Sequence, residues 1–584
     1  MTTDDAAQAG PASSANVEAT PGRSLARNTA VMAAGTLVSR VLGLVRNTIL
    51  LVAAISVTGI AADAYSVANR LPNVMFAVLA AGVLNSALVP QIVRAFSDGR
   101  ERTVHRIVTV GTVSILAVTV VFTLTAGFWV RLYSDNWGPD QTALATAFAL
   151  WCIPQLFFYG LYSLLGQVLN AREQFAAFMW APVANNVVAI AGLVVYLAAY
   201  GRYAPVHSSA AEVVDQWTIG RIVLIAGVAT LGIAAQALVL IVPLWRGGYR
   251  WRWVWRGPKG ELSTVARVAS WALGAVLLEQ VGVALVSRVA TAAPRAAAVL
   301  EAASGSAHPD TLVPDPSVAG AAVYDMALSM YLLPHSLVAI SLMTVLFTRM
   351  SRFAAAHDLV SLRGVLSEGV RLVGAFMMLA SAILFVAAPH VVRVLAFTAN
   401  ADTIDAVSWS LRCMVLGLVP LGASVMFKQA YFALEDGRTV FLIHIAMTAA
   451  WLAVAYGVKW TASPQWWVAG VSLGLTATNI VSVVLRMWGL RSRLHGVDGR
   501  RIGTTYAKSF TAALGAAVPG VVIMWLAPST WDDAGAGAVL GSVATLIAVA
   551  VVMTMTYLML SRILHIPETH AATRVLLRRL RHVP

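Results

Sequence analysis

Long apolar runs recur along the whole chain, and they constrain its fold more than any other feature. A helix that crosses the hydrocarbon core of a bilayer needs about 20 mostly apolar residues, and this 584-residue sequence offers such runs repeatedly, between short basic or Gly- and Pro-containing connections. Hydrophobic residues make up 59% of the chain and charged residues only 12%, which is untypical of a soluble domain. The runs are too long, and alternate too little, for the strands of a membrane barrel. We therefore predict an all-α polytopic membrane protein.

The hydropathy pattern predicts about 14 transmembrane helices. Basic residues gather in alternate connections between the apolar runs, and acidic residues gather in the intervening ones. Because basic residues remain on the inner side of a membrane, both termini are predicted to be cytoplasmic. The net charge of +14 is then explained by basic cytoplasmic connections that contact anionic lipids. No nucleic acid is expected as a partner. The predicted spans lie near residues 28–55, 61–94, 103–132, 141–171, 176–200, 219–245, 264–290, 318–349, 365–389, 405–434, 438–460, 465–490, 504–527 and 535–563.

A weak internal repeat divides these spans into two lobes. Pro72 and Pro334 are 262 residues apart, and so are Gln167 and Gln429. An even number of spans separates the members of each pair, which predicts parallel repeats that face each other across a central cavity, the architecture of a transporter. The predicted domains are a disordered cytoplasmic tail, an N-lobe of spans 1–6, a C-lobe of spans 7–12, two additional C-terminal spans and a basic cytoplasmic tail, at 1–22, 23–260, 261–495, 496–564 and 565–584.

The sequence contains no motif that indicates an enzyme or a cofactor site. A phosphate-binding glycine loop and an HExxH helix are both missing. The only two cysteines, Cys152 and Cys413, both lie within apolar runs and indicate neither a disulfide framework nor a metal site. Transport, without catalytic residues, metal or cofactor, is the function that this pattern favours.

Two arginines within the first apolar run are the best candidates for a binding site. Arg40 and Arg46 lie in the segment SRVLGLVR, with apolar residues on both sides. A charge near the middle of a membrane helix costs about 3 kcal/mol on insertion scales, so such residues usually face a watered cavity that needs them. Two cations there predict a substrate with anionic groups. The alternative is that both side chains reach an interface, which their depth in the run disfavours.

Polar residues in the second span follow one stripe of a helix. Asp63, Ser66, Arg70 and Asn73 recur at intervals of three and four residues. We expect this stripe to face the cavity and to contact substrate. For Asp63 there is an equally good alternative to substrate contact, namely that it only pairs with Arg70 or with the backbone near the outer membrane interface.

Two charged residues of the predicted C-lobe complete the candidate substrate site. Glu279 lies close to the middle of span seven, where it could partner an arginine, take up a proton or help bind a cation; a structural ion pair between the lobes is the alternative. Lys428 lies in the inner half of span ten. Its side chain could either contact substrate or extend to the membrane–water interface.

Six segments of the chain match a known family in the order in which they occur there: SRVLGLVR (Ser39–Arg46), DAYSVANRLPN (Asp63–Asn73), ALVP (Ala87–Pro90), LNAREQF (Leu169–Phe175), APVANN (Ala181–Asn186) and YFALEDGRT (Tyr431–Thr439). With them the chain resembles the MurJ (MviN) lipid II flippase family of the multidrug/oligosaccharidyl-lipid/polysaccharide exporter superfamily. The resemblance implies a fourteen-helix, two-lobed transporter that alternates between inward-open and outward-open states. Its substrate would be the undecaprenyl-diphosphate-linked peptidoglycan precursor, with Arg40 and Arg46 matching arginines implicated in holding the diphosphate. Asp63 matches an acidic residue at the start of span two, and Arg70 stands where a basic residue is common.

This chain departs from the family pattern at several cavity positions. Asn47 replaces the usual aspartate after the second arginine, and the other departures also replace charged residues, so the resemblance implies a less charged cavity than in other members. They are Phe76, Ala81, Ser329 and Leu332.

Two other function classes stay open at this point. One is a different exporter of the same superfamily, for another lipid-linked glycan or for drugs. The other is a non-transporting scaffold for cell-wall assembly, in which cell-wall synthesis proteins would be the partners. Exporters of cationic drugs are expected to have acidic cavities, whereas arginines outnumber acids in the first lobe here.

Overall fold

The structure is a computed structural model. It describes residues 21–50, 54–80, 92, 100–172, 174–203, 210–255, 266–303, 314–315, 317–397, 399–527 and 536–569. Most of the two predicted tails lies outside the described residues, as do Ala81, the ALVP segment and residues 304–313 between predicted spans seven and eight.

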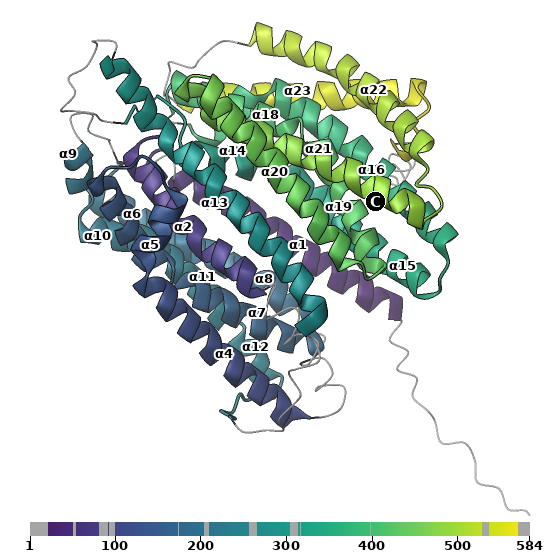
Figure 1. The fold of residues 1–584 in the computed structure, drawn as a ribbon, viewed down its shortest axis with the longest axis horizontal. Coiled ribbons are helices and arrows are strands. Elements are labelled where there is room, and N and C mark those ends of the chain that lie inside the picture. The colour runs from purple at the N-terminus through teal and green to yellow at the C-terminus, as the bar shows by residue number, and fades with distance from the viewer. Residues whose placement is uncertain are drawn as a thin grey trace, which may run out of the picture.

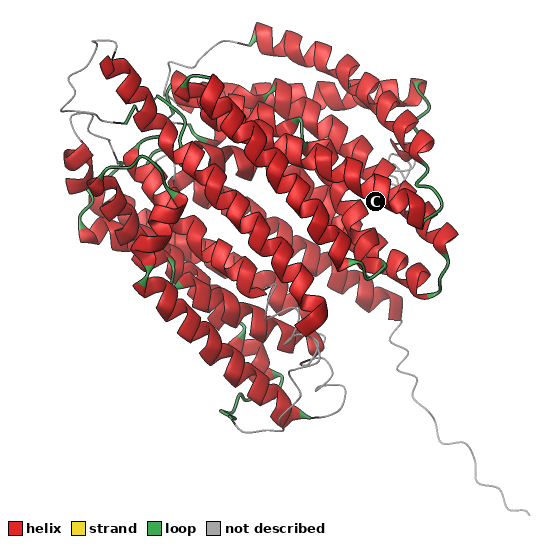
Figure 2. Cartoon of the chain, viewed as in Figure 1, coloured by secondary structure: helices red, strands yellow, loops and turns green. Residues whose placement is uncertain are grey.

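All the secondary structure of the described ranges is helical (Figure 2). Helices are expected here because the bilayer core contains no water to bond backbone N–H and C=O groups, and a helix satisfies these groups internally. The first half of the chain contains α1 (Pro21–Ile49), α2 (Ile60–Leu79), α4 (Glu101–Leu124), α5 (Ala126–Tyr133), α6 (Pro139–Cys152), α7 (Gln155–Ala171), α8 (Phe175–Tyr200), α9 (Ala210–Asp215), α10 (Ile219–Ile222), the π-helix η3 (Val223–Gly227), α11 (Val228–Leu238) and α12 (Ile241–Arg246).

The second half begins with a long helix, α13 (Ala266–Ala303), which runs between the two groups of helices in Figure 1. It continues with α14 (Ala321–Pro334), the π-helix η5 (His335–Ala339), α15 (Ile340–Ala355), α16 (Leu359–Val386), α17 (Ala388–Leu395), α18 (Ala401–Val415), α19 (Leu418–Ala433), α20 (Gly437–Thr461), η6 (Pro464–Trp466), α21 (Trp467–Arg493), α22 (Gly499–Leu526) and α23 (Ala536–Ile563).

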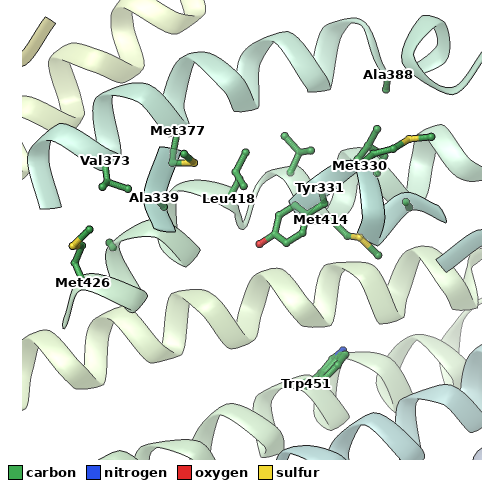
Figure 3. Packing of buried hydrophobic residues seen from close by; sticks show 14 of the residues in the cluster. Met330, Tyr331, Ala339, Val373, Met377, Ala388, Met414, Leu418, Met426 and Trp451 are labelled. Carbon is green, nitrogen blue, oxygen red and sulfur yellow. The ribbon is translucent and has the colours of Figure 1, made fainter. Parts of the chain in front are cut away.

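Buried apolar side chains form separate cores for the two halves of the chain. Two clusters lie mainly among helices α2 to α12, and the largest lies among helices α13 to α23. Figure 3 shows part of this largest core, where Met330 and Tyr331 of α14 pack near Met414 and Leu418. Residues of α13 and of the start of α14 belong to clusters of both halves, so these two helices join the halves.

Ten helical segments in the described ranges are long and apolar enough to cross a membrane, or eleven if the bent pair α18 and α19 is one span. Each of them coincides with one of the fourteen predicted spans. The other three predicted spans, the first, second and eighth, coincide with α1, with α2 and with the run from α14 to α15, which do not pass that test over the described residues. The prediction of an all-α polytopic membrane protein is confirmed.

Two of the predicted continuous spans contain π-helical turns. Span six passes from α10 through η3 into α11, and span eight passes from α14 through η5 into α15. Pro334 ends α14 directly before η5, and a proline inside a helix removes one backbone hydrogen bond and crowds the preceding turn. Single π-turns of this kind are frequent at functional sites.

Helices α22 and α23 lie together at the outside of the second half, beyond α16 (Figure 1). Tyr506 of α22 donates a hydrogen bond to the Val370 carbonyl oxygen of α16 at 2.9 Å, and Tyr557 of α23 donates one to the Ala375 carbonyl oxygen at 2.8 Å. These bonds join the last two predicted spans to the second half of the molecule only.

Candidate functional site

The first turn of α14 is held by a carboxylate from α2. Asp63, in the first turn of α2, is 2% exposed, and its Oδ1 accepts a hydrogen bond from the Ala322 backbone N–H at 2.9 Å. The first four N–H groups of a helix have no partner inside the helix, and the helix dipole favours a negative charge at that end. Gly320 precedes this turn, and a side chain there would collide with the Asp63 carboxylate. Asp63 is therefore a cap that α2 supplies to α14.

A second carboxylate reaches in the opposite direction, from α14 to α2. Asp325 Oδ1 lies 2.5 Å from Arg70 Nη2, and its Oδ2 accepts a hydrogen bond from the Ser66 hydroxyl. Arg70 also donates to Ser287 Oγ of α13 at 3.1 Å. We call this set of four side chains, together with the Asp63 cap, the α2–α14 contact. It closes the two halves of the molecule against each other at the end where α2 and α14 begin.

Two cavities adjoin the α2–α14 contact, and a third cavity shares part of its wall with them. The N-lobe cavity, of 200 Å³, lies among α1, α2, α7, α8 and α11. The gate cavity, of 280 Å³, lies between α1, α2 and α14, and the C-lobe cavity, of 510 Å³, extends from α2 and α14 to α21. Asn73 lines all three, whereas Arg70 and Asp325 line the last two. Of the rest of the predicted polar stripe of α2, Ser66 lines the gate cavity only, and Asp63 lines none of the three.

Arg46 lines both the N-lobe cavity and the gate cavity. Its Nη2 donates to the Oδ1 of the neighbouring Asn47 at 3.1 Å. An aspartate at position 47 would offset the guanidinium charge, but the amide of Asn47 leaves it intact. Since Arg70 is paired with Asp325, the gate cavity carries one uncompensated positive charge, on Arg46, among its described wall residues.

Arg40 occupies a different place from Arg46. Its guanidinium donates a hydrogen bond to the hydroxyl of Ser336, in the π-helical turn η5 of the second half. Arg40 and Arg46 are six residues apart on the continuous helix α1, so they point in different directions. In this conformation Arg46 faces the gate cavity, and Arg40 joins α1 to the helix break after Pro334.

The C-lobe cavity brings together the two C-lobe candidates. Glu279 of α13 and Lys428 of α19 both line it. The Glu279 side chain is exposed to the cavity and lies within ion-pair distance of no basic side chain that the structure describes. Lys428 Nζ lies 5.6 Å from the centre of the Phe432 ring, and it too has no ion pair in the described ranges.

Two charged wall residues escaped the sequence reasoning. Asp325 follows Asp63 by 262 residues, the offset that relates Pro72 to Pro334, so the repeat itself contains the signal for it. Arg486 lines the C-lobe cavity from α21, and the signal for it was an arginine within an apolar run. In the residues described, no group of three His, Cys, Asp or Glu side chains could hold a metal ion.

Three of the departures from the expected family pattern, Asn47, Ser329 and Leu332, line the gate cavity, whereas Phe76 lines none of the three cavities. Ser329 and Leu332 line the gate cavity from α14, and the Ser329 hydroxyl donates to the Asp325 carbonyl oxygen at 2.8 Å. Neither adds a charge, so Arg46, Arg70 and Asp325 are the charged side chains of the described gate-cavity wall.

Comparison with known proteins gives one consistent result. A family model described as "Lipid II flippase MurJ" matches residues 52–540. A "Probable lipid II flippase MurJ" of Rhizobium meliloti (strain 1021) is 26% identical over 521 residues, covering 86% of this chain and 88% of that protein. Another, of Synechocystis sp., is 28% identical over 228 residues, and the match spans about two fifths of each protein, 39% of this chain and 41% of the relative.

Two solved structures have the same fold. One is described as "Lipid II flippase MurJ, inward closed conformation"; it has a TM-score of 0.66 at 15% identity and covers 91% of this chain and 98% of its own. The other is an inward-facing multidrug resistance MATE family transporter of the MOP superfamily, with a TM-score of 0.59 at 14% identity and coverage of 79% and 96%. At these identities the likeness concerns the fold alone.

Proposed function

Because this chain belongs to the lipid II flippase MurJ family, we propose that it carries lipid II, the undecaprenyl-diphosphate-linked peptidoglycan precursor, across the cytoplasmic membrane by alternating access. The family consists of multi-pass membrane transporters, not enzymes, in agreement with the expectation from the sequence. The single observation that supports the proposal is the placement of Arg46 and Arg70 on the wall of one cavity between the two halves.

In this proposal Arg46 receives the diphosphate. Guanidinium groups form bidentate, charge-assisted hydrogen bonds with phosphate oxygens, and these bonds replace the water that the anion loses on entering the cavity. Arg46 has no acidic partner in the described part of the chain, and the neutral Asn47 keeps its charge available. Arg40 would contact the headgroup in another conformation, when its hydrogen bond with Ser336 is broken.

Arg70 acts as a switch in the same scheme. With the α2–α14 contact closed, Asp325 neutralises the Arg70 guanidinium. When the two halves separate, Arg70 loses this partner and becomes free to bind a phosphate group at the gate cavity. Substrate and Asp325 therefore compete for one guanidinium, which couples binding of the headgroup to opening of this end. Asp63 would favour the closed state by capping α14.

The remaining candidates complete the path. Asn73 would contact the headgroup from all three cavities, while Glu279 and Lys428 would contact it from the C-lobe side. We propose the domain division predicted from the sequence, with lobes at 23–260 and 261–495 and the last two spans at 496–564. The polyprenyl chain would remain in lipid, near α22 and α23.

We also propose that both termini are cytoplasmic and that anionic lipids surround the inner face. A groove of 1160 Å³ between the end of α21 and the start of α22 supports this. Its wall carries Arg491, Arg500 and Arg501, whose side chains form no ion pair with the described residues. Trp488 is 75% exposed on the same wall, as is typical of tryptophans at headgroup depth.

The experiment that tests the function uses cells in which this protein is the only lipid II flippase. Lipid II exposed outside is measured for the wild type and for Arg46→Ala and Arg70→Ala, with protein amounts matched. Loss of exposure together with accumulation of lipid II inside supports the proposal. Accumulation of a different lipid-linked glycan on depletion would indicate another exporter. Normal exposure in both variants would remove these arginines from the mechanism and favour a scaffold.

A further inference from the structure

Arg486, near the middle of the second half, is a buried cation without a counter-ion. It belongs to α21, is 2% exposed, and lies within 4 Å of no carboxylate among the residues that the structure describes. Its Nη1 donates to the Ser424 carbonyl oxygen at 3.0 Å and to Ser424 Oγ at 2.5 Å, and its Nη2 lies 3.7 Å from Met447 Sδ. Its Nε has no hydrogen-bond partner in the structure. Neutral groups alone therefore hold this charge.

A buried charge of this kind is costly for the protein. An ion in a low-dielectric interior loses several kcal/mol of hydration, which a partner of opposite charge normally offsets. Within a membrane protein, a charged residue that is kept despite this cost usually marks a path for ions or substrate. Arg486 lines the C-lobe cavity, so its missing partner has space to enter.

The charges around the C-lobe cavity do not balance. Its described wall holds Arg70 and Asp325, which pair with each other, and then Lys428, Arg486 and Glu279. Glu279 attracts both remaining cations electrostatically but lies within 4 Å of neither. One net positive charge is left on the wall when His444 is neutral. The cavity also offers neutral polar side chains, among them Asn479, which is 4% exposed.

We propose that Arg486 and Lys428 form an anion-binding site on the C-lobe wall, separate from the Arg46 site. The ligand is a compact anion, either a free inorganic anion such as chloride or a carboxylate of the transported molecule. The second source rests on the proposed function, because it requires a substrate that carries an acidic group besides its diphosphate. The C-lobe and gate cavities share Arg70, Asn73 and Asp325 on their walls, so one extended headgroup can reach both sites.

The first test measures binding of chloride alone to the purified full-length protein. The thermal midpoint Tm is followed while sodium chloride replaces sodium methanesulfonate at constant ionic strength. A ligand that binds only the folded state raises Tm once its concentration exceeds its dissociation constant, and the rise then grows with the logarithm of that concentration. We expect this rise for the wild type, and we expect Lys428→Gln to require at least ten times more chloride for the same rise. Lys508→Gln is the matched control, since Lys508 is exposed on α22 and lines none of the three cavities.

The second test distinguishes the source of the anion. Binding of lipid II is compared with binding of undecaprenyl diphosphate, which lacks the acidic peptide. If the site takes a substrate carboxylate, Lys428→Gln weakens lipid II binding about tenfold and leaves undecaprenyl diphosphate unchanged. Arg486→Lys keeps the buried charge but changes its geometry, and it should give an intermediate loss even if Arg486→Gln does not fold.

Two results would overturn the proposal. One is a chloride response that Arg46→Gln abolishes and Lys428→Gln leaves unchanged, because the anion would then bind in the N-lobe. The other is the absence of both the chloride response and the lipid II effect. A wild-type protein that responds to chloride through Lys428 but never binds lipid II would refute the proposed function and leave the anion site standing.

Discussion

Asp63 and Asp325 are 262 residues apart, the offset that also relates Pro72 to Pro334, and each carboxylate crosses to the other half of the molecule. Asp63 accepts a hydrogen bond from a backbone N–H at the start of α14. Asp325 accepts hydrogen bonds from the side chains of Ser66 and Arg70 on α2. A parallel repeat brings equivalent helices face to face around a common axis. Two acidic residues that share the offset of the predicted repeat thus supply both sides of the α2–α14 contact.

Replacing Asp325 by asparagine should open this contact. The substitution removes the charge that holds Arg70, and hydrogen bonds to charged groups contribute about 1.5–3 kcal/mol each. We expect the closed state to lose on the order of 2 kcal/mol relative to the open one. A cysteine introduced at Ser329, on the gate cavity, should then react faster with a membrane-impermeant maleimide in intact cells, in a background with Cys413 replaced by serine.

The control for this experiment is Asp402→Asn, at an exposed position in the first turn of α18. It should leave labelling unchanged. Faster labelling of the Asp325→Asn protein only in inverted vesicles would show that the α2–α14 contact faces the cytoplasm, which contradicts the proposed orientation.

Gly320→Ala should disturb the same contact without altering any charge. The added methyl group would meet the Asp63 carboxylate, which is held between α2 and the first turn of α14 and has little room to move. We expect reduced lipid II export and faster labelling of the gate cavity. Gly457→Ala, whose added methyl group meets nothing within 4 Å, is the matched control and should behave as wild type. Equal behaviour of both variants would mean that the cap is not needed for closure.

Arg46→Lys should weaken binding although it keeps the charge. Lysine presents a point charge instead of the planar fork that matches two phosphate oxygens. We expect the dissociation constant for undecaprenyl diphosphate to rise about tenfold, equivalent to about 1.4 kcal/mol. Arg412→Lys, at a position that lines none of the three cavities, is the comparison and should leave the constant unchanged. Unaltered affinity of the Arg46→Lys protein would show that charge alone is recognised at this position.

Glu568→Gln should lower the stability of the second half of the molecule. Glu568 follows α23 and forms a buried ion pair with Arg371 of α16, which also donates to the Ser367 carbonyl oxygen at 3.2 Å. Removing one member of a buried pair leaves the other charge uncompensated and typically costs about 3–5 kcal/mol. Thermal unfolding of the purified protein should show a clear decrease in Tm.

Glu368→Gln serves as the control for that prediction, because Glu368 is exposed on the same helix, three residues before Arg371. The double replacement Arg371→Met with Glu568→Leu should recover most of the lost stability, since an apolar pair of similar size avoids the desolvation cost of both charges. A double variant as unstable as Glu568→Gln would show that the ion pair itself is required there.

The sequence by itself determined that this chain is a bundle of membrane helices, because about 20 consecutive apolar residues have no other stable form in a bilayer. The repeat, the polar stripe of α2 and the unusual depth of Arg46 were also evident from the order of residues alone. Tertiary structure decided which charges meet. Asp325 and Arg70 are 255 residues apart, and only the packing of α14 against α2 makes them a pair. The same packing gives Arg46 no acidic partner among the described residues and brings Arg40 to Ser336. A charge in a membrane helix reveals in sequence that it needs a partner, but the identity of that partner depends on distances between helices, which the local pattern of residues does not contain.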